Sequence, residues 1–280
     1  MPAVTKELDI AVTAWGPESQ NILTFTHGEG GDIYETKFDG KEWEHLGVVA
    51  KAKPSSPMRS HLTGRTGYLR VVFIGNDNTI QLAIHNGKYW QLYGTSTKVH
   101  ALSRLAARYD NDGKYRVFAQ AEDGKIVQVS FDRSKGKYGV TVAFKDAVPG
   151  SSIAVTPNGI PRVNAWRPEK DNWISEDFPI VGKANMQLAA LDREDLKDLP
   201  DNPDRELHVF YNIGVGFTER YYTYKGWKDG CPLPSGPGPI TTMVKGNGRV
   251  AVFSHNRDDQ TRIFKVSNED NWEAKKIIVA

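Results

Sequence analysis

The chain has 280 residues, 39% of them hydrophobic and 25% charged, so it is long enough to bury a sizeable core and too evenly mixed to be disordered. Its 36 basic and 34 acidic residues give a formal net charge of +2, which argues against nucleic acid or an anionic membrane as a partner. The single cysteine, Cys231, excludes an internal disulfide and a multi-cysteine zinc site. No basic segment followed by an apolar run begins the chain, and no apolar run approaches the ~20 residues that span a bilayer, so we expect a cytoplasmic protein.

A degenerate internal repeat extends along the chain. Six segments of similar shape, LDIAVTA, RSHLTGR, LSRLAAR, SSIAVTP, NMQLAAL and GPITTMV, begin near residues 8, 59, 102, 151, 185 and 238. Their third residues, Ile10, His61, Arg104, Ile153, Gln187 and Ile240, lie 51, 43, 49, 34 and 53 residues apart. Periods of about 40–50 residues are typical of a four-stranded propeller blade.

Each segment is followed by patterns for further strands. A second strand such as YLRVVF or KYRVFA is rich in β-branched and aromatic residues, and a turn such as EDG leads to an alternating third strand such as DIYETKF. In five of the six copies an aromatic residue begins the outermost strand: Trp43, Trp90, Tyr138, Trp227 and Trp272. We therefore predict an all-β fold, a six-bladed β-propeller of mostly four-stranded antiparallel blades that forms one domain over residues 1–280.

The second half of the chain departs from this regular pattern. The step from Ile153 to Gln187 is the shortest, about one strand and a turn below the others, so blade four is predicted to have only three strands. Blade five carries the insertion LDREDLKDLPDNPDRE, whose proline and acidic residues favour a surface loop. The stretch CPLPSGPGP is predicted to be an extended linker into blade six.

The pattern resembles the fungal fucose-specific lectins, which are six-bladed β-propellers of this length. The resemblance rests on the phrase SSIAVTP, on an R-V pair in the second strand and on DIYETKFDGKEW, and it covers nearly the whole chain. It implies that each sugar site uses an arginine on the second strand, a glutamate on the third, and aromatic side chains as a platform for fucose. A guanidinium and a carboxylate can donate to and accept from neighbouring sugar hydroxyls.

Most blades have lost one member of this implied pair. The residues at the two positions are Leu23 and Glu35 in blade one, Arg70 and Leu82 in blade two, Arg116 and Gln128 in blade three, His208 and Glu219 in blade five, and Ala251 and Lys265 in blade six. Only blade four has the full pair, Arg162 and Glu176. At least four of the six implied sugar sites are therefore predicted to be lost.

Polar residues on the innermost strands point instead to the axial channel of the propeller. His61, Arg104 and Gln187 stand where the other three blades have isoleucine, and Arg65 and Arg108 follow four residues later in blades two and three. Leaving such groups unpaired costs about 1–3 kcal/mol each, so they should be paired or bind a ligand. For Arg65 and Arg108 a cross-link between blades is the alternative, and for Trp166 it is packing within a blade.

The chemistry predicted for this channel needs no cofactor. No histidine spacing typical of a metal site, no glycine-rich phosphate cradle and no serine elbow occurs in the sequence. The chain also resembles the lectin-like hetero-Diels-Alderases of tropolonic sesquiterpenoid biosynthesis, which join a quinone methide to an alkene terpene. That resemblance implies a cofactor-independent pericyclase of fungal secondary metabolism with an apolar natural-product substrate in the channel. His61 or Arg104 would hydrogen-bond the heterodiene oxygen, Gln187 would fix its approach, and Arg65, Arg108 and Trp166 would bind substrate.

Two other functions stay open at this point. One is a fucose- or glycan-binding lectin with one or two residual sites, at Arg162 with Glu176 or at Arg116 with Gln128. The other is a scaffold whose polar channel groups satisfy one another. The expected partner is therefore a small apolar molecule or a glycan, and the sequence leaves open whether two copies form a dimer.

Overall fold

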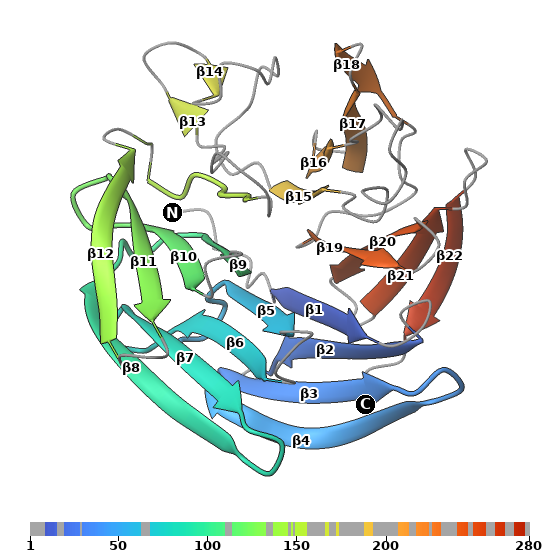
Figure 1. Ribbon diagram of the computed structural model, residues 1–280, viewed down its shortest axis with the longest axis horizontal. Coiled ribbons are helices and arrows are strands. Elements are labelled where there is room, and N and C mark those ends of the chain that lie inside the picture. The colour runs from blue at the N-terminus through green and yellow to red at the C-terminus, as the bar shows by residue number, and fades with distance from the viewer. Residues whose placement is uncertain are drawn as a thin grey trace.

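The computed structural model describes residues 9–15, 20–28, 30–62, 68–109, 114–132, 137–144, 147, 149–155, 166–167, 172–173, 188–192, 207–212, 217–223, 226–230, 240–245, 249–255, 261–266 and 272–277. These residues form sheets arranged radially around a central axis (Figure 1). Five sheets have four antiparallel strands in simple chain order, and a sixth has two strands. The predicted all-β propeller is confirmed.

The first three blades follow one another from the N-terminal end of the described chain. Blade one contains β1 (Ile10–Trp15), β2 (Asn21–His27), β3 (Asp32–Phe38) and β4 (Trp43–Lys51). Blade two contains β5 (Met58–Leu62), β6 (Leu69–Ile74), β7 (Thr79–His85) and β8 (Trp90–Lys98). Blade three contains β9 (Leu105–Tyr109), β10 (Tyr115–Gln120), β11 (Ile126–Asp132) and β12 (Lys137–Phe144).

The remaining blades complete the circle. Blade four is represented by β13 (Trp166–Arg167) and β14 (Asn172–Trp173). Blade five contains β15 (Leu188–Asp192), β16 (Leu207–Asn212), β17 (Phe217–Thr223) and β18 (Gly226–Asp229). Blade six contains β19 (Ile240–Lys245), β20 (Arg249–His255), β21 (Thr261–Val266) and β22 (Trp272–Ile277). The first strand predicted for blade four from SSIAVTP is not formed at residues 151–155, which the structure describes as irregular. Most of the insertion in blade five and the linker before blade six lie outside the described residues.

Burial across a blade explains why these sequences form these strands. The second strand of blade two, β6, is buried along its whole length, including Arg70 within its otherwise apolar sequence. The third strands β3 and β7 contain both buried and half-buried residues. The outermost strand β4 exposes most of its residues. Gly31 closes the turn before β3 at φ 86°, where a Cβ would collide with the carbonyl oxygen of Ala52.

Apolar clusters between neighbouring blades hold the ring together. One cluster joins blades one and two through Phe25, Ile33, Val71 and other buried residues, and a second joins blades two and three. Phe253 of blade six packs against Ile10 and Val12 of blade one. The ring is therefore closed by contact between the first and the last blade.

Candidate functional site

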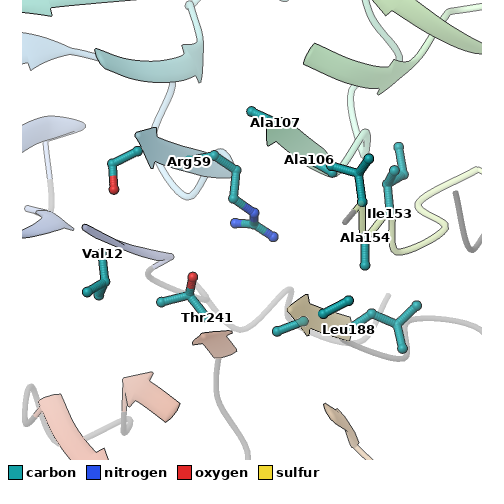
Figure 2. A pocket seen from close by; sticks show the side chains of 12 residues that line it. Val12, Arg59, Ala106, Ala107, Ile153, Ala154, Leu188 and Thr241 are labelled. Atoms are coloured by element: carbon teal, nitrogen blue, oxygen red, sulfur yellow. The ribbon is translucent and has the colours of Figure 1, made fainter. Parts of the chain in front are cut away.

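A cavity of about 100 Å³ lies on the axis between the innermost strands. Small side chains form much of its wall, among them Ala106 and Ala107 from β9 and Ala189 and Ala190 from β15. Figure 2 shows Arg59 of β5 reaching into this space. Apolar side chains and one guanidinium line the cavity, and polar atoms make up more of its exposed wall than carbon atoms do.

The predicted axial residues that the structure describes are not among those that line this cavity. His61 lies on β5 with its ring stacked on Tyr109 of blade three at 5.6 Å and 12°, so it faces the neighbouring blade. Burial, together with the nearby charge of Arg70, lowers the pKa of His61 to about 4. The neutral His61 ring packs between the two blades, so it does not line the axial cavity.

The other predicted axial residues are placed as follows. Arg104 precedes β9 and is half-buried, and Arg108 is buried on β9 opposite Arg116 of β10. Trp166 begins β13, and its side chain is outside the described part of the molecule. Gln187 and Arg65 lie outside the described residues, as do Arg162 and Glu176. The catalytic and substrate-binding roles of these residues stay predictions.

The volume of the axial cavity bears on the predicted cycloaddition. Pockets for drug-sized ligands usually measure about 300–1,000 Å³. At about 100 Å³, the cavity between the described strands is smaller than any of these. It gives no support to an axial site for two joined natural-product reactants.

A different constellation forms where blade one meets blade two. The indole Nε1 of Trp90, the first residue of β8, donates a hydrogen bond of 3.2 Å to Oε2 of Glu35 on β3. Phe25 packs edge-on against the Trp90 ring at 5.9 Å, and His85 lies 5.2 Å from it. Both Glu35 and Trp90 are half-buried. A carboxylate and a partly exposed aromatic ring from two blades therefore share one surface.

Charge around Glu35 is set by its environment. Burial raises the pKa of Glu35, while the Trp90 hydrogen bond and the charge of Lys37 act in the opposite direction. Lys37 pairs with Leu23 across β2 and β3, and Glu35 pairs with Phe25, so all four side chains share a face. Lys37 thus places a cation on the face where Leu23 replaces the implied arginine. Sequence reasoning missed it, although its spacing of two residues from Glu35 on a strand was the signal.

The corresponding interface between blades two and three is closed. The Arg70 guanidinium carbon lies 5.3 Å from the ring centre of Tyr109 and 5.8 Å from that of Tyr115. Arg70 is buried, and Leu82, at the implied glutamate position, is buried with it. Burial also raises the pKa of the Tyr115 hydroxyl. Here the arginine serves packing between blades.

Blade three brings together one of the predicted sugar pairs. Arg116 stands opposite Ser130, and Gln128 on the same face donates a hydrogen bond of 3.0 Å from Nε2 to Ser130 Oγ. Arg116 and Gln128 are half-buried, whereas Arg108 opposite Arg116 is buried. The pair predicted from sequence is therefore adjacent on one sheet face, with an amide in place of the carboxylate.

Blade five has the implied glutamate but pairs it internally. His208 Nδ1 and Glu219 Oε1 are 2.5 Å apart, and both side chains are buried. Tyr221 stacks on the His208 ring at 5.9 Å. A Cβ at Gly230 would collide with the Glu219 side chain, so this glycine is needed for the close packing. The Glu219 carboxylate is therefore already paired with His208.

Comparison with known proteins places the chain. The family model described as fungal fucose-specific lectin matches residues 7–167, more than half of the chain. The chain belongs to the fungal fucose-specific lectin family. The Aspergillus fumigatus fucose-specific lectin is 30% identical over 167 residues, which are 55% of this chain and 52% of that protein. The match thus spans about half of the length of this relative.

Solved structures of lectins share the fold. SapL1 lectin in complex with alpha methyl fucoside superposes with a TM-score of 0.80 at 18% identity, over 98% of this chain and 97% of the other. The Aleuria aurantia lectin, described as a six-bladed β-propeller, gives a TM-score of 0.74 at 18% identity over 97% and 96% of the two chains. The six-bladed propeller of this family member is thereby confirmed, as is the resemblance to the fungal lectins.

Two further features of this lectin-family chain concern metals and membranes. Among the described residues, no group of three or more histidine, cysteine, aspartate or glutamate side chains is placed to hold a metal ion. Within the same part of the chain, no helix is long and apolar enough to cross a membrane.

Proposed function

We propose that the protein is a lectin that binds a fucose-type monosaccharide between blades one and two. The observation that carries this proposal is the hydrogen bond between Trp90 and Glu35, which joins an aromatic ring and a carboxylate across two blades. These are the groups that the lectin resemblance implies for a sugar site. The family membership, and relatives described as fucose-specific or solved with a fucoside, support the same ligand class.

The site has the chemistry to hold a monosaccharide. A carboxylate offers about four lone-pair positions, and Trp90 uses one of them, so Glu35 can accept hydrogen bonds from sugar hydroxyls. The half-exposed Trp90 ring offers a surface for the apolar face of the sugar. Lys37 supplies the donor that the resemblance assigns to arginine. An ammonium group from the neighbouring strand therefore takes the place of the expected guanidinium.

The number of sugar sites is proposed to be lower than the number of blades. Arg70 is covered by aromatic rings, and Glu219 is held by His208, so neither presents the implied pair to a ligand. The adjacent Arg116 and Gln128 are proposed as a second, weaker site, because an amide makes weaker hydrogen bonds to hydroxyls than a carboxylate does. Low valency follows from these replacements.

The proposed function is tested by titrating the protein with α-methyl fucoside in a calorimeter. Glu35→Gln should weaken binding at the stronger site by about tenfold or more, because hydrogen bonds to a charged acceptor are lost. Glu42→Gln is the matched control, since Glu42 is exposed in the turn before β4 of the same blade, and it should bind as the wild type does. Absence of fucoside binding by the wild type, or equal binding by Glu35→Gln, would overturn the proposal.

The cofactor-independent cycloaddition has less support than the lectin function. It is supported by the resemblance to the lectin-like hetero-Diels-Alderases, whereas the axial cavity measures only about 100 Å³. It stays a prediction from the sequence.

A further inference from the structure

Arg59 occupies a position at which three other blades have alanine. Strand register defines the equivalent positions. In each blade, the equivalent of Arg59 is the first-strand residue whose partner on the second strand pairs in turn with the implied glutamate position on the third strand. By this criterion the equivalents of Arg59 in blades one, three and five are Ala11, Ala106 and Ala189. A methyl group is therefore enough at this place in blades one, three and five, whereas blade two has a guanidinium.

The hydrogen bonds of Arg59 engage only one of its three nitrogen atoms. Nη1 donates to Oδ2 of Asp9 at 3.1 Å and to the carbonyl oxygen of Met58 at 2.7 Å. Nε and Nη2 make no hydrogen bond within the described part of the chain. These two atoms form one edge of the guanidinium fork, the geometry that binds both oxygens of a carboxylate.

The charge of Arg59 is only partly neutralised by Asp9. The Asp9 carboxylate also accepts hydrogen bonds from the backbone N–H of Met58 at 2.8 Å and of Ile10 at 3.0 Å. Its negative charge is therefore shared among three donors, two of which belong to the backbone. The Nε and Nη2 edge, on the other side of the guanidinium, keeps positive potential for a second anionic group.

The cavity limits the size and the character of what can bind there. Figure 2 shows the Arg59 guanidinium extending into the space above Thr241, with Val12, Ala106, Ala154 and Leu188 around it. A volume of about 100 Å³ corresponds to about three water molecules at ~30 Å³ each. A small carboxylate matches the fork and the volume, and the apolar side chains among the lining residues can contact a short alkyl chain.

We infer that the axial cavity is a binding site for a short aliphatic carboxylate of about two to four carbons, whose carboxylate bonds to the Nε and Nη2 edge of Arg59. Its alkyl chain lies against the alanine and leucine side chains, and the Thr241 hydroxyl donates to one carboxylate oxygen. This site is separate from the proposed sugar site, which lies between blades one and two around Trp90 and Glu35.

The test is a titration of the full chain with ¹³C-labelled propionate, followed by NMR, beside a titration with propionamide, which has the same size but no charge. Propionate should bind saturably at one site per chain, and propionamide should bind about tenfold more weakly or less. Arg59→Lys keeps the charge but loses the fork, and should weaken propionate binding by about tenfold. Thr241→Val, which keeps the side-chain shape, should weaken it about threefold to tenfold.

Arg220→Lys on β17 is the control for general electrostatic attraction, and it should bind propionate as the wild type does. Arg59→Ala introduces the residue of the equivalent positions and should abolish binding. If that variant does not fold, Arg59→Lys and the amide comparison still decide the matter. No saturable propionate binding by the wild type, equal binding of propionamide, or unchanged binding by Arg59→Lys would each overturn the inference. Fucoside binding, measured on the same samples, reports separately on the proposed lectin function.

Discussion

Each of the two interfaces beside blade two contains one member of an implied arginine–glutamate pair, the glutamate at one interface and the arginine at the other. Between blades one and two, the carboxylate of Glu35 is present, half-buried and bonded to Trp90 of the next blade. Between blades two and three, the guanidinium of Arg70 is present but buried under Tyr109 and Tyr115. One interface leaves polar groups accessible, and the other encloses them.

The contrast shows that the surroundings of a residue decide its role more than its identity does. A buried arginine covered by aromatic rings contributes cation–π and packing energy to the ring of blades. A half-buried carboxylate beside an aromatic ring keeps hydrogen-bonding capacity for a ligand. Changes at the blade two and three interface should therefore affect stability, and changes at the blade one and two interface should affect sugar binding.

The largest effect is expected for Tyr115→Ala at the packed interface. Tyr115 is 2% exposed and contacts the cluster between blades two and three, so its removal should lower the free energy of unfolding by ~3–5 kcal/mol. Urea denaturation measures this loss. Tyr89→Ala is the control, because Tyr89 is 56% exposed, and it should change the free energy by no more than ~0.5 kcal/mol. Equal losses of unfolding free energy in the two variants would show that packing at this interface does not stabilise the protein more than an exposed side chain does.

The second effect is a dependence of stability on pH that comes from His61. Its pKa is about 4 in the folded protein against an ordinary value of 6.5, because burial and then the charge of Arg70 disfavour the protonated form. The unfolded chain therefore binds more protons between these values, and stability falls as the pH is lowered from 6.5 to about 4. The loss should reach about 3 kcal/mol at most.

Urea denaturation of the wild type and of His61→Phe across this pH range isolates the contribution. Phenylalanine keeps a ring to stack on Tyr109 but does not titrate, so the variant should lose less stability on acidification. Parallel pH profiles of the two proteins would show that His61 is not the titrating group.

The third effect concerns ligand binding at the other interface. Trp90→Phe keeps an aromatic ring but removes the N–H that donates to Glu35, so fucoside affinity should fall by about tenfold. Its thermal stability should change far less than that of Tyr115→Ala. Calorimetric titration measures the affinity, with Tyr138→Phe as the control at an exposed tyrosine of blade three. Unchanged affinity in Trp90→Phe would mean that the hydrogen bond does not organise the sugar site.

The repeat in the sequence was enough to predict the propeller, because apolar periodicity and turn residues recur in each blade. The first strands of blades one, two and five begin within three residues of the segment starts at 8, 59 and 185. The candidate site was harder to predict, because it joins residues from two blades that lie far apart in sequence, such as Glu35 and Trp90. For His61 and Arg59 the strand pattern placed both on one inner strand, but only packing shows that one contacts the next blade and the other reaches the axis.

The smallest effect is expected at Lys37, the cation proposed to replace the missing arginine of blade one. Lys37→Gln should weaken fucoside binding by about threefold, because a partly exposed ammonium contributes only about 0.2–1 kcal/mol. Lys37 also acts to lower the pKa of Glu35, so its removal should raise that pKa further. In the proposed site the sugar binds to the ionised Glu35 carboxylate, so the pH at which binding is lost on acidification should move upward in this variant. Calorimetric titrations at several pH values measure both quantities.

Lys41→Gln, at an exposed position in the turn after β3, should alter neither the fucoside affinity nor its pH dependence. If Lys37→Gln weakened binding without moving the pH profile, Lys37 would contact the sugar without influencing Glu35. If it did neither, the arginine lost from blade one would have no replacement, and the site would depend on Glu35 and Trp90 alone.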